Sequence, residues 1–313
     1  MPEGSLQTLL FADVAAIHLG LALVMGALAC QLWLRGSDDV WARQVLLQSR
    51  TAQRVGAGVT FVASALGLWM QAAVMGDVQL LVAGTMITMV LRDTHFGHAW
   101  LLGLGTWAMM SAAAWSPDAQ RWSIRRFVIG CFGVAGFALS RSVVSHAGSA
   151  GDFTLAVGID WIHLVMVCLW VGIVLMGACV RLPTADSAHH DYATAMRWAA
   201  ALSSTATGAL ILIGLTGIFK TWQSTPTLEA LASSSYGRVL AVKLILVAGA
   251  VALGGVNRFL VIPRMFASPR VGDAFGWRGR NSFVWILRVE AFVLTLALVA
   301  AAVLSASQPP IDD

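Results

Sequence analysis

Eight long apolar runs constrain the fold of this 313-residue chain more than any other feature. A helix needs about 20 apolar residues to cross the roughly 30 Å hydrocarbon core of a bilayer. The runs span about residues 12–34, 55–76, 95–115, 125–147, 155–180, 198–220, 237–261 and 283–306. In lipid, the backbone polar groups of each run must be satisfied within a helix. The sequence therefore predicts an all-α, polytopic membrane protein with eight transmembrane helices.

The composition agrees with this class and excludes several others. The chain is 58% hydrophobic and 12% charged, with a mean hydropathy of +0.76, whereas soluble domains are roughly 45–50% apolar and 25% charged. Its arginines sit mainly in short blocks between the apolar runs, which indicates orientation signals and no nucleic-acid binding. The partner that this surface requires is the lipid bilayer. Phosphate-binding loops and hydrolase motifs are missing from the sequence, which excludes an ATP-driven pump.

The distribution of Lys and Arg predicts the orientation. With eight crossings, fifteen basic residues fall on one face and four on the other. Because basic residues collect in cytoplasmic loops, both termini are predicted on the non-cytoplasmic side. In a Gram-negative bacterium this side is the periplasm, so the sequence predicts a multi-pass inner-membrane protein with periplasmic termini.

Similar residues recur in the two halves of the chain. Residues 1–150 and 151–313 each contain four runs, which predicts a parallel 4+4 internal repeat with its axis along the membrane normal. The matched positions are Asp13 and His18-Leu19 with Asp160 and His163-Leu164, and Thr94-His95-Phe96-Gly97 with Ser234-Ser235-Tyr236-Gly237. Repeats of this kind often place the working site at their interface.

Histidines gather toward the outer leaflet in this topology. An intramembrane histidine is costly and signals a function unless it is paired. The five in this region are His18, His95, His98, His146 and His163. Imidazole and thioether groups suit a transition metal such as copper.

The predicted metal site combines three histidines and two methionines. Met25 stands seven residues after His18, and Met166 stands three after His163, so each pair shares a helix face. The predicted ligands are His18, His146, His163, Met25 and Met166. The alternative is that the methionines pack in the core and the histidines bond neighbouring helices.

Charged residues near these histidines allow two interpretations. Asp13 and Asp160 precede the two intramembrane histidines and are predicted to orient the imidazoles from a second ligand shell. Alternatively, they favour the positive ends of two helices. Lys243 is a fixed positive charge in the same leaflet, which raises the cost of binding a cation there.

The order of motifs along the chain resembles the CopD family of bacterial copper resistance proteins. The motifs include Asp160-x-x-His163-Leu164, Trp170-x-Gly172, Tyr236-Gly237-Arg238 with Lys243, Asn257-Arg258 and Arg288-x-Glu290, and in the first half His18-Leu19, Thr94-x-Phe96-Gly97-x-x-Trp100 and Ser145-His146-Ala147. The family's recurring histidines match His18, His146 and His163. One departure is Gly103, where the family often has a basic residue equivalent to Lys243.

The resemblance implies an eight-helix inner-membrane protein that moves copper and works with a small periplasmic copper-binding protein of the CopC type. The leading hypothesis is therefore copper transport through a histidine site in the outer leaflet, with no enzymatic activity. A second hypothesis is a membrane redox protein in which the same histidines bind haem b. A third is a docking protein that receives a copper carrier without translocating the ion.

Overall fold

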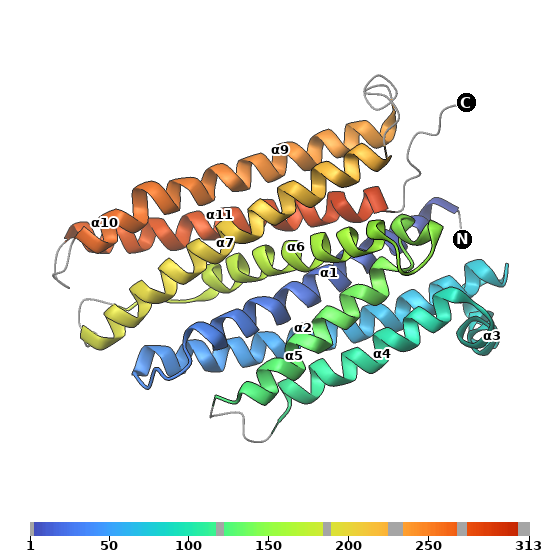
Figure 1. Ribbon diagram of the computed structural model, residues 1–313, viewed down its shortest axis with the longest axis horizontal. Helices are drawn as coiled ribbons and strands as arrows, with labels where there is room; N and C mark the ends of the chain where they lie inside the picture. Colours follow the sequence, from blue (N-terminus) through green and yellow to red (C-terminus); the bar gives the residue numbers. More distant parts are fainter. Residues whose placement is uncertain (1–2, 117–121, 184–188, 225–233, 268–273, 306–313) are drawn as a thin grey trace.

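A computed structural model describes the chain except for residues 1–2, 117–121, 184–188, 225–233, 268–273 and 306–313. The described residues form a bundle of long helices joined by short segments (Figure 1). The elements, in order, are α1 (Glu3–Trp33), α2 (Val40–Met75), η1 (Leu80–Met86), α3 (Ile87–Asp93), α4 (His95–Ala114), α5 (Ile124–Ser142), η2 (His146–Ala150), α6 (Leu155–Cys179), α7 (His189–Ser224), α9 (Ser235–Val256), η3 (Asn257–Val261), α10 (Ile262–Ala267) and α11 (Ala274–Ser305).

The all-α prediction is confirmed, and each apolar run lies within or overlaps a long helix. Six helices are long and apolar enough to cross a membrane: Leu6–Trp33, Val40–Met75, Leu155–Cys179, His189–Gln223, Tyr236–Met265 and Asn281–Ser305. The runs in α4 and α5 are absent from this group. Two histidines begin α4 or lie in its first turn, and three arginines lie in α5, which lowers their apolar character. The eight-span topology, the 4+4 repeat and the position of the termini stay predictions.

Several helices are longer than the apolar runs within them. α2 begins at Val40 and α7 at His189, about 15 and 9 residues before the corresponding runs. The additional turns carry polar residues, which a helix accommodates where it leaves the lipid for water. The run predicted at 125–147, by contrast, extends beyond its helix, because α5 ends at Ser142. His146 therefore begins the short helix η2 and does not lie at the end of α5.

Side-chain caps begin two helices that the predicted repeat would relate, α4 and α9. The Thr94 hydroxyl accepts a hydrogen bond of 3.0 Å from Gly97 N at the start of α4. The Ser234 hydroxyl accepts one of the same length from Gly237 N at the start of α9. Such caps satisfy orphan N–H groups in the first turn. The recurrent Thr-x-x-Gly and Ser-x-x-Gly segments thus have the same local role in both halves.

The centre of the bundle is the contact between α1 and α6 (Figure 1). The helices run parallel, since Cys168 lies beside His18, and Gly172 lies beside Ala22 and Gly26. A Cβ atom on Gly26 would lie 2.1 Å from the carbonyl oxygen of Gly172. Only glycine permits this approach, and small residues commonly bring membrane helices together in this way.

The two central helices fix the position of the polar site. They begin at the same end of the bundle, where α3 also lies, and this end is called the α3 end below (Figure 1). The large apolar core surrounds α1 and α6 and includes Ile17, Ile173 and Leu287, each almost fully buried. Polar side chains on the halves of α1 and α6 nearest this end are therefore held together by the packing of the apolar core.

Candidate functional site

Seven polar side chains from five helices gather toward the α3 end of the bundle. This group, called the polar cluster below, comprises Asp13 and His18 of α1, Arg141 of α5, Asp160 and His163 of α6, Lys220 of α7 and Lys243 of α9. Each member interacts electrostatically with at least one other. The structure therefore brings the two intramembrane histidines, His18 and His163, into one charged environment, together with both predicted aspartates.

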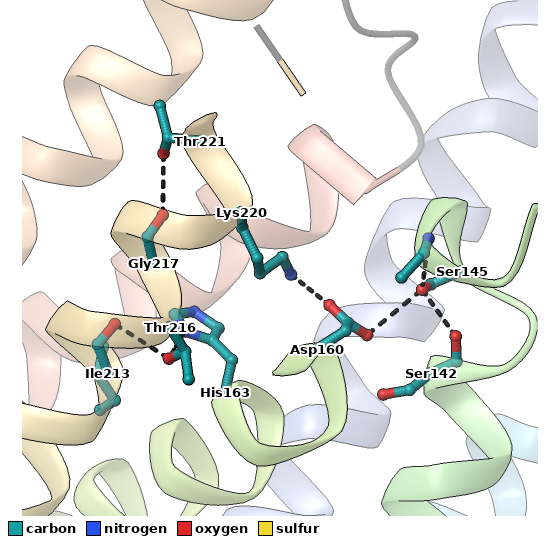
Figure 2. Close-up of polar contacts among 10 residues, drawn as sticks. Ser142, Ser145, Asp160, His163, Ile213, Thr216, Gly217, Lys220 and Thr221 are labelled. Atoms are coloured by element: carbon teal, nitrogen blue, oxygen red, sulfur yellow. Dashed lines mark hydrogen bonds and ion pairs between the residues drawn. The ribbon is translucent and has the colours of Figure 1, made fainter. Parts of the chain in front are cut away.

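His163 is held by α7. Its Nδ1 lies 2.8 Å from the hydroxyl oxygen of Thr216 (Figure 2). That hydroxyl donates its single hydrogen to backbone carbonyls one turn earlier, Leu212 O at 2.6 Å and Ile213 O at 3.2 Å. The oxygen must then accept a hydrogen bond from His163, which assigns the proton to Nδ1. In a neutral imidazole this leaves the lone pair of Nε2 available for a metal.

Asp160 contacts α7 and the segment that follows α5. Its carboxylate forms an ion pair with Lys220 of α7 (Figure 2). The second oxygen lies 3.3 Å from the Ser145 hydroxyl, which also bonds the Ser142 carbonyl at 2.8 Å. The side chain of Asp160 is 13% exposed and that of Lys220 is 40% exposed. The role of Asp160 in orienting an imidazole stays a prediction, because the orienting contact of His163 is with Thr216.

His18 lies where the charges of both halves meet. Arg141, Asp160, Lys243 and Lys220 all act on its imidazole electrostatically. Its backbone carbonyl lies 3.8 Å from the Cys168 thiol, which places His18 against α6. The cluster contains three fixed cations and two carboxylates, so an incoming metal ion meets a net positive surrounding unless one cation withdraws.

Asp13 interacts with the first-half cation. Arg141 acts on this carboxylate electrostatically. Oδ1 is buried and has no hydrogen-bond partner among the described residues. Oδ2 lies against Gly67 of α2, where an added Cβ would be only 2.5 Å away. Asp13 is thus an intramembrane carboxylate held between α1, α2 and α5, about one and a half turns before His18.

The remaining predicted ligands lie outside the centre of the cluster. Met25 and Met166 are half-buried and pack against the apolar core, as the alternative interpretation expects. His146 is exposed, although it directly follows Ser145, which contacts Asp160. Within the described part of the chain, no group of three or more His, Cys, Asp or Glu side chains is placed to hold a metal ion. The five-residue ligand set stays a prediction.

The two histidines at the start of α4 have structural partners. His95 Nε2 lies 2.7 Å from Asp152 Oδ1, which ties the start of α4 to the segment before α6. His98 Nε2 lies 3.0 Å from the backbone oxygen of Arg92. Both rings are exposed. Neither histidine forms part of the polar cluster.

Sequence reasoning missed Thr216 and the ion pair of Lys220. A signal for the pair was present, since an acid and a base within apolar helices pair with one another by preference. Asp160 and Lys220 both satisfy that description and are predicted at the same leaflet. Thr216 gives no comparable signal, because threonines in membrane helices commonly bond their own backbone.

Comparisons with known families match both halves of the chain. The family described as Copper resistance protein D matches residues 196–304. The family described as Copper resistance protein D-like, N-terminal domain, matches residues 6–153. Comparison with curated proteins and with solved structures gives no match. The two family matches follow one another along the chain and cover most of it, and they contain every residue of the polar cluster except Asp160 and His163. The chain therefore belongs to the copper resistance protein D family.

Proposed function

We propose that this protein carries copper ions across the bacterial inner membrane and that the polar cluster is where the ion first binds. The family assigns the chain to copper resistance. The observation that carries the proposal is the hydrogen bond from His163 to Thr216, which leaves Nε2 as a free ligand atom. His18 shares the same surrounding charges and supplies a second imidazole on the neighbouring central helix.

Copper binding competes with the ion pair between Asp160 and Lys220. A metal ion adds positive charge beside three cations. Repulsion between like charges a few ångströms apart is substantial in a low dielectric. Lys220 is the cation most able to move, because its side chain is long and 40% exposed. Its departure frees the Asp160 carboxylate to offset the charge of the metal. The empty site and the loaded site thus differ in the partner of Asp160.

The inward path follows α1 and α6. Met166 lies about 4.5 Å deeper than His163, and Met25 about 10.5 Å deeper than His18, by the rise of a helix. Thioethers are soft ligands that suit cuprous copper. A membrane potential of 100 mV, negative inside, favours inward movement by about 2.3 kcal/mol per charge. With eight spans and periplasmic termini, the α3 end faces the periplasm and receives copper from a small carrier of the CopC type.

The test is the copper content of purified protein and its uptake into vesicles. We expect His163→Ala to lose bound copper and uptake, because Nε2 is removed. His98→Ala is the matched control, since that exposed imidazole bonds only the Arg92 carbonyl among the described contacts, and it should behave as wild type. Unchanged copper binding in His163→Ala would refute the proposal.

The same samples distinguish the two other hypotheses. Copper bound without uptake into sealed vesicles identifies a docking protein that captures the ion from a carrier. Stoichiometric iron with a Soret absorption band identifies a haem b protein, in which the two histidines serve as axial ligands. Copper binding and uptake without iron would support a transporter with no enzymatic activity.

A further inference from the structure

Glu290 is a buried carboxyl group that the polar cluster does not include. It lies on α11, nine residues after Asn281, where the membrane-spanning part of this helix begins. The helical rise places it about 13.5 Å into the span, near the middle of a hydrocarbon core of about 30 Å. Glu290 is only 3% exposed. The carboxyl group is therefore far from either aqueous face.

The Glu290 carboxyl group lies between α9 and α6. On one side it lies against α9, where a Cβ atom added to Gly254 would be 3.4 Å from Oε1. On the other side the indole N–H of Trp170 on α6 interacts with it. Trp170 is 2% exposed, and its N–H makes no hydrogen bond of regular geometry to any described residue. The contact joins three helices at one polar point within an apolar core.

No described cation forms an ion pair with Glu290. The nearest in sequence, Arg288, is exposed and donates to the Ala178 carbonyl. The other titratable groups described on elements packed against α11 are Lys243, Arg238 and Tyr236 on α9, Arg258 on η3, Arg264 on α10, Asp160, His163, Cys168 and Cys179 on α6, and Asp13, His18 and Cys30 on α1. Arg258 donates to Ser203 of α7, and Asp160 pairs with Lys220.

A carboxylate without a counter-ion in such an environment costs several kcal/mol, so the group takes up a proton. A cation that passes within a few ångströms favours the ionised form instead, because the carboxylate then neutralises the charge of the cation in a low dielectric. Trp170 is seven residues after His163, which places Glu290 about 10.5 Å deeper than the outer histidines along α6. Glu290 thus lies below the site where copper is proposed to bind.

We propose that Glu290 is a proton-binding site that gives up its proton when a monovalent copper ion crosses the membrane. The O–H bond of the carboxyl group breaks, the proton leaves to water on the side from which the ion enters, and the carboxylate left behind balances the charge of the ion. When the ion has passed, the carboxylate takes up a proton from the opposite side, so one proton is exchanged for each ion. This inference rests on the proposed function, since the cation that displaces the proton is copper.

The first test is an infrared spectrum of the purified protein in lipid nanodiscs at neutral pH. The carbonyl stretching band of a protonated carboxyl group should be present in wild type and lose intensity in Glu290→Gln, which keeps the shape of the side chain. Asp77→Asn is the control, because Asp77 is an exposed carboxylate in the turn after α2, and it should keep the band. Identical spectra in wild type and Glu290→Gln would overturn the proposal.

The second test measures protons and copper together in proteoliposomes loaded with a pH-sensitive dye. Addition of copper(I) outside should remove about one proton from the lumen for each ion that wild type transports inward. Glu290→Gln should bind copper at the polar cluster as wild type does, and its proton signal should fall at least tenfold. Equal proton signals from both proteins would contradict the role of Glu290. If wild type binds no copper, the transport proposal fails, while the infrared band still decides whether Glu290 holds a proton.

Discussion

At the scale of single residues, one hydroxyl determines which nitrogen of His163 is free. Thr216 directs its hydrogen to the backbone of α7 and so accepts from Nδ1. A metal-binding histidine commonly has its second nitrogen fixed by such an outer contact, and loss of that contact typically lowers metal affinity about 10- to 100-fold. Thr216 belongs to this class if His163 is a ligand.

We predict that Thr216→Val lowers the copper affinity of the purified protein about 10- to 100-fold. Valine keeps the shape of threonine but cannot accept from Nδ1, so the imidazole loses both its fixed orientation and its fixed tautomer. Competition titration against a copper chelator measures the change. Thr221→Val is the control, because among the described contacts its hydroxyl bonds only the Gly217 carbonyl one turn earlier on the same helix. An affinity equal to that of wild type in Thr216→Val would show that the contact is only structural.

At the scale of elements, the ion pair between Asp160 and Lys220 connects α6 to α7. Breaking one member of a buried pair strands a charge, whereas removing both members is far less costly. Lys220 is 40% exposed, so water screens the pair in part and the expected effect is smaller than for a fully buried one. The pair should therefore make a measurable but moderate contribution to the association of these helices.

A double-mutant cycle tests this contribution. Asp160→Asn and Lys220→Met should each lower thermal stability in detergent, and the double variant should recover part of the loss. The expected coupling is about 1–2 kcal/mol, within the range for residues in contact. Thermal unfolding followed by tryptophan fluorescence measures it. Additive effects of the two substitutions would mean that the pair contributes nothing to stability.

The observed helix boundaries show how accurately the apolar runs predicted each helix. The run predicted at 155–180 matches α6, Leu155–Cys179, because this helix is apolar along its length and capped by Thr154. The run at 198–220 underestimates α7, because apolarity marks only the part of a helix that lies in lipid. His189 and His190 lie before this run, and they begin α7. Apolar composition thus locates the parts of helices that lie in lipid. The ends of helices that lie in water are defined only by the structure.

The polar site was predictable in its depth and not in its contacts. His18, Asp160 and His163 could be placed near one leaflet by counting residues from the helix ends. Which side of α6 faces α7 depends on packing, including the contact of Gly26 with Gly172, and no spacing along one helix reveals it. The partners Thr216 and Lys220 became visible only when both helices were positioned.

At the scale of the whole molecule, α4 and α5 determine whether the chain crosses the membrane six or eight times. Six helices have the length and apolarity of spans, while α4 and α5 pack together beside them. Arginines at the start of α5 resemble the basic segments that stay in the cytoplasm. If α4 and α5 both cross, the end of α4 at Ala114 and the start of α5 at Ile124 lie on the cytoplasmic side.

Reporter fusions measure this arrangement. Alkaline phosphatase, which is active only outside the cytoplasm, should be active when fused after Asp313 and inactive when inserted after Ser116. A fluorescent protein that matures only in the cytoplasm should give the reverse pattern. An active phosphatase at Ser116 would contradict the eight-span arrangement and would leave α4 and α5 as a hairpin that does not cross.

The contact of Gly26 with Gly172 also has a consequence for biosynthesis. About 145 residues separate the two glycines, so at ~5–20 residues per second the ribosome needs about 7–29 s to deliver the second after the first. During that time α1 is in the membrane without its central partner. Its other close contact is with α2, where Gly20 lies against Gly56 and Thr60, and α2 is made directly afterwards. The α1–α2 hairpin is thus the assembly that must persist in the bilayer, with one glycine face uncovered, until α6 is inserted beside it.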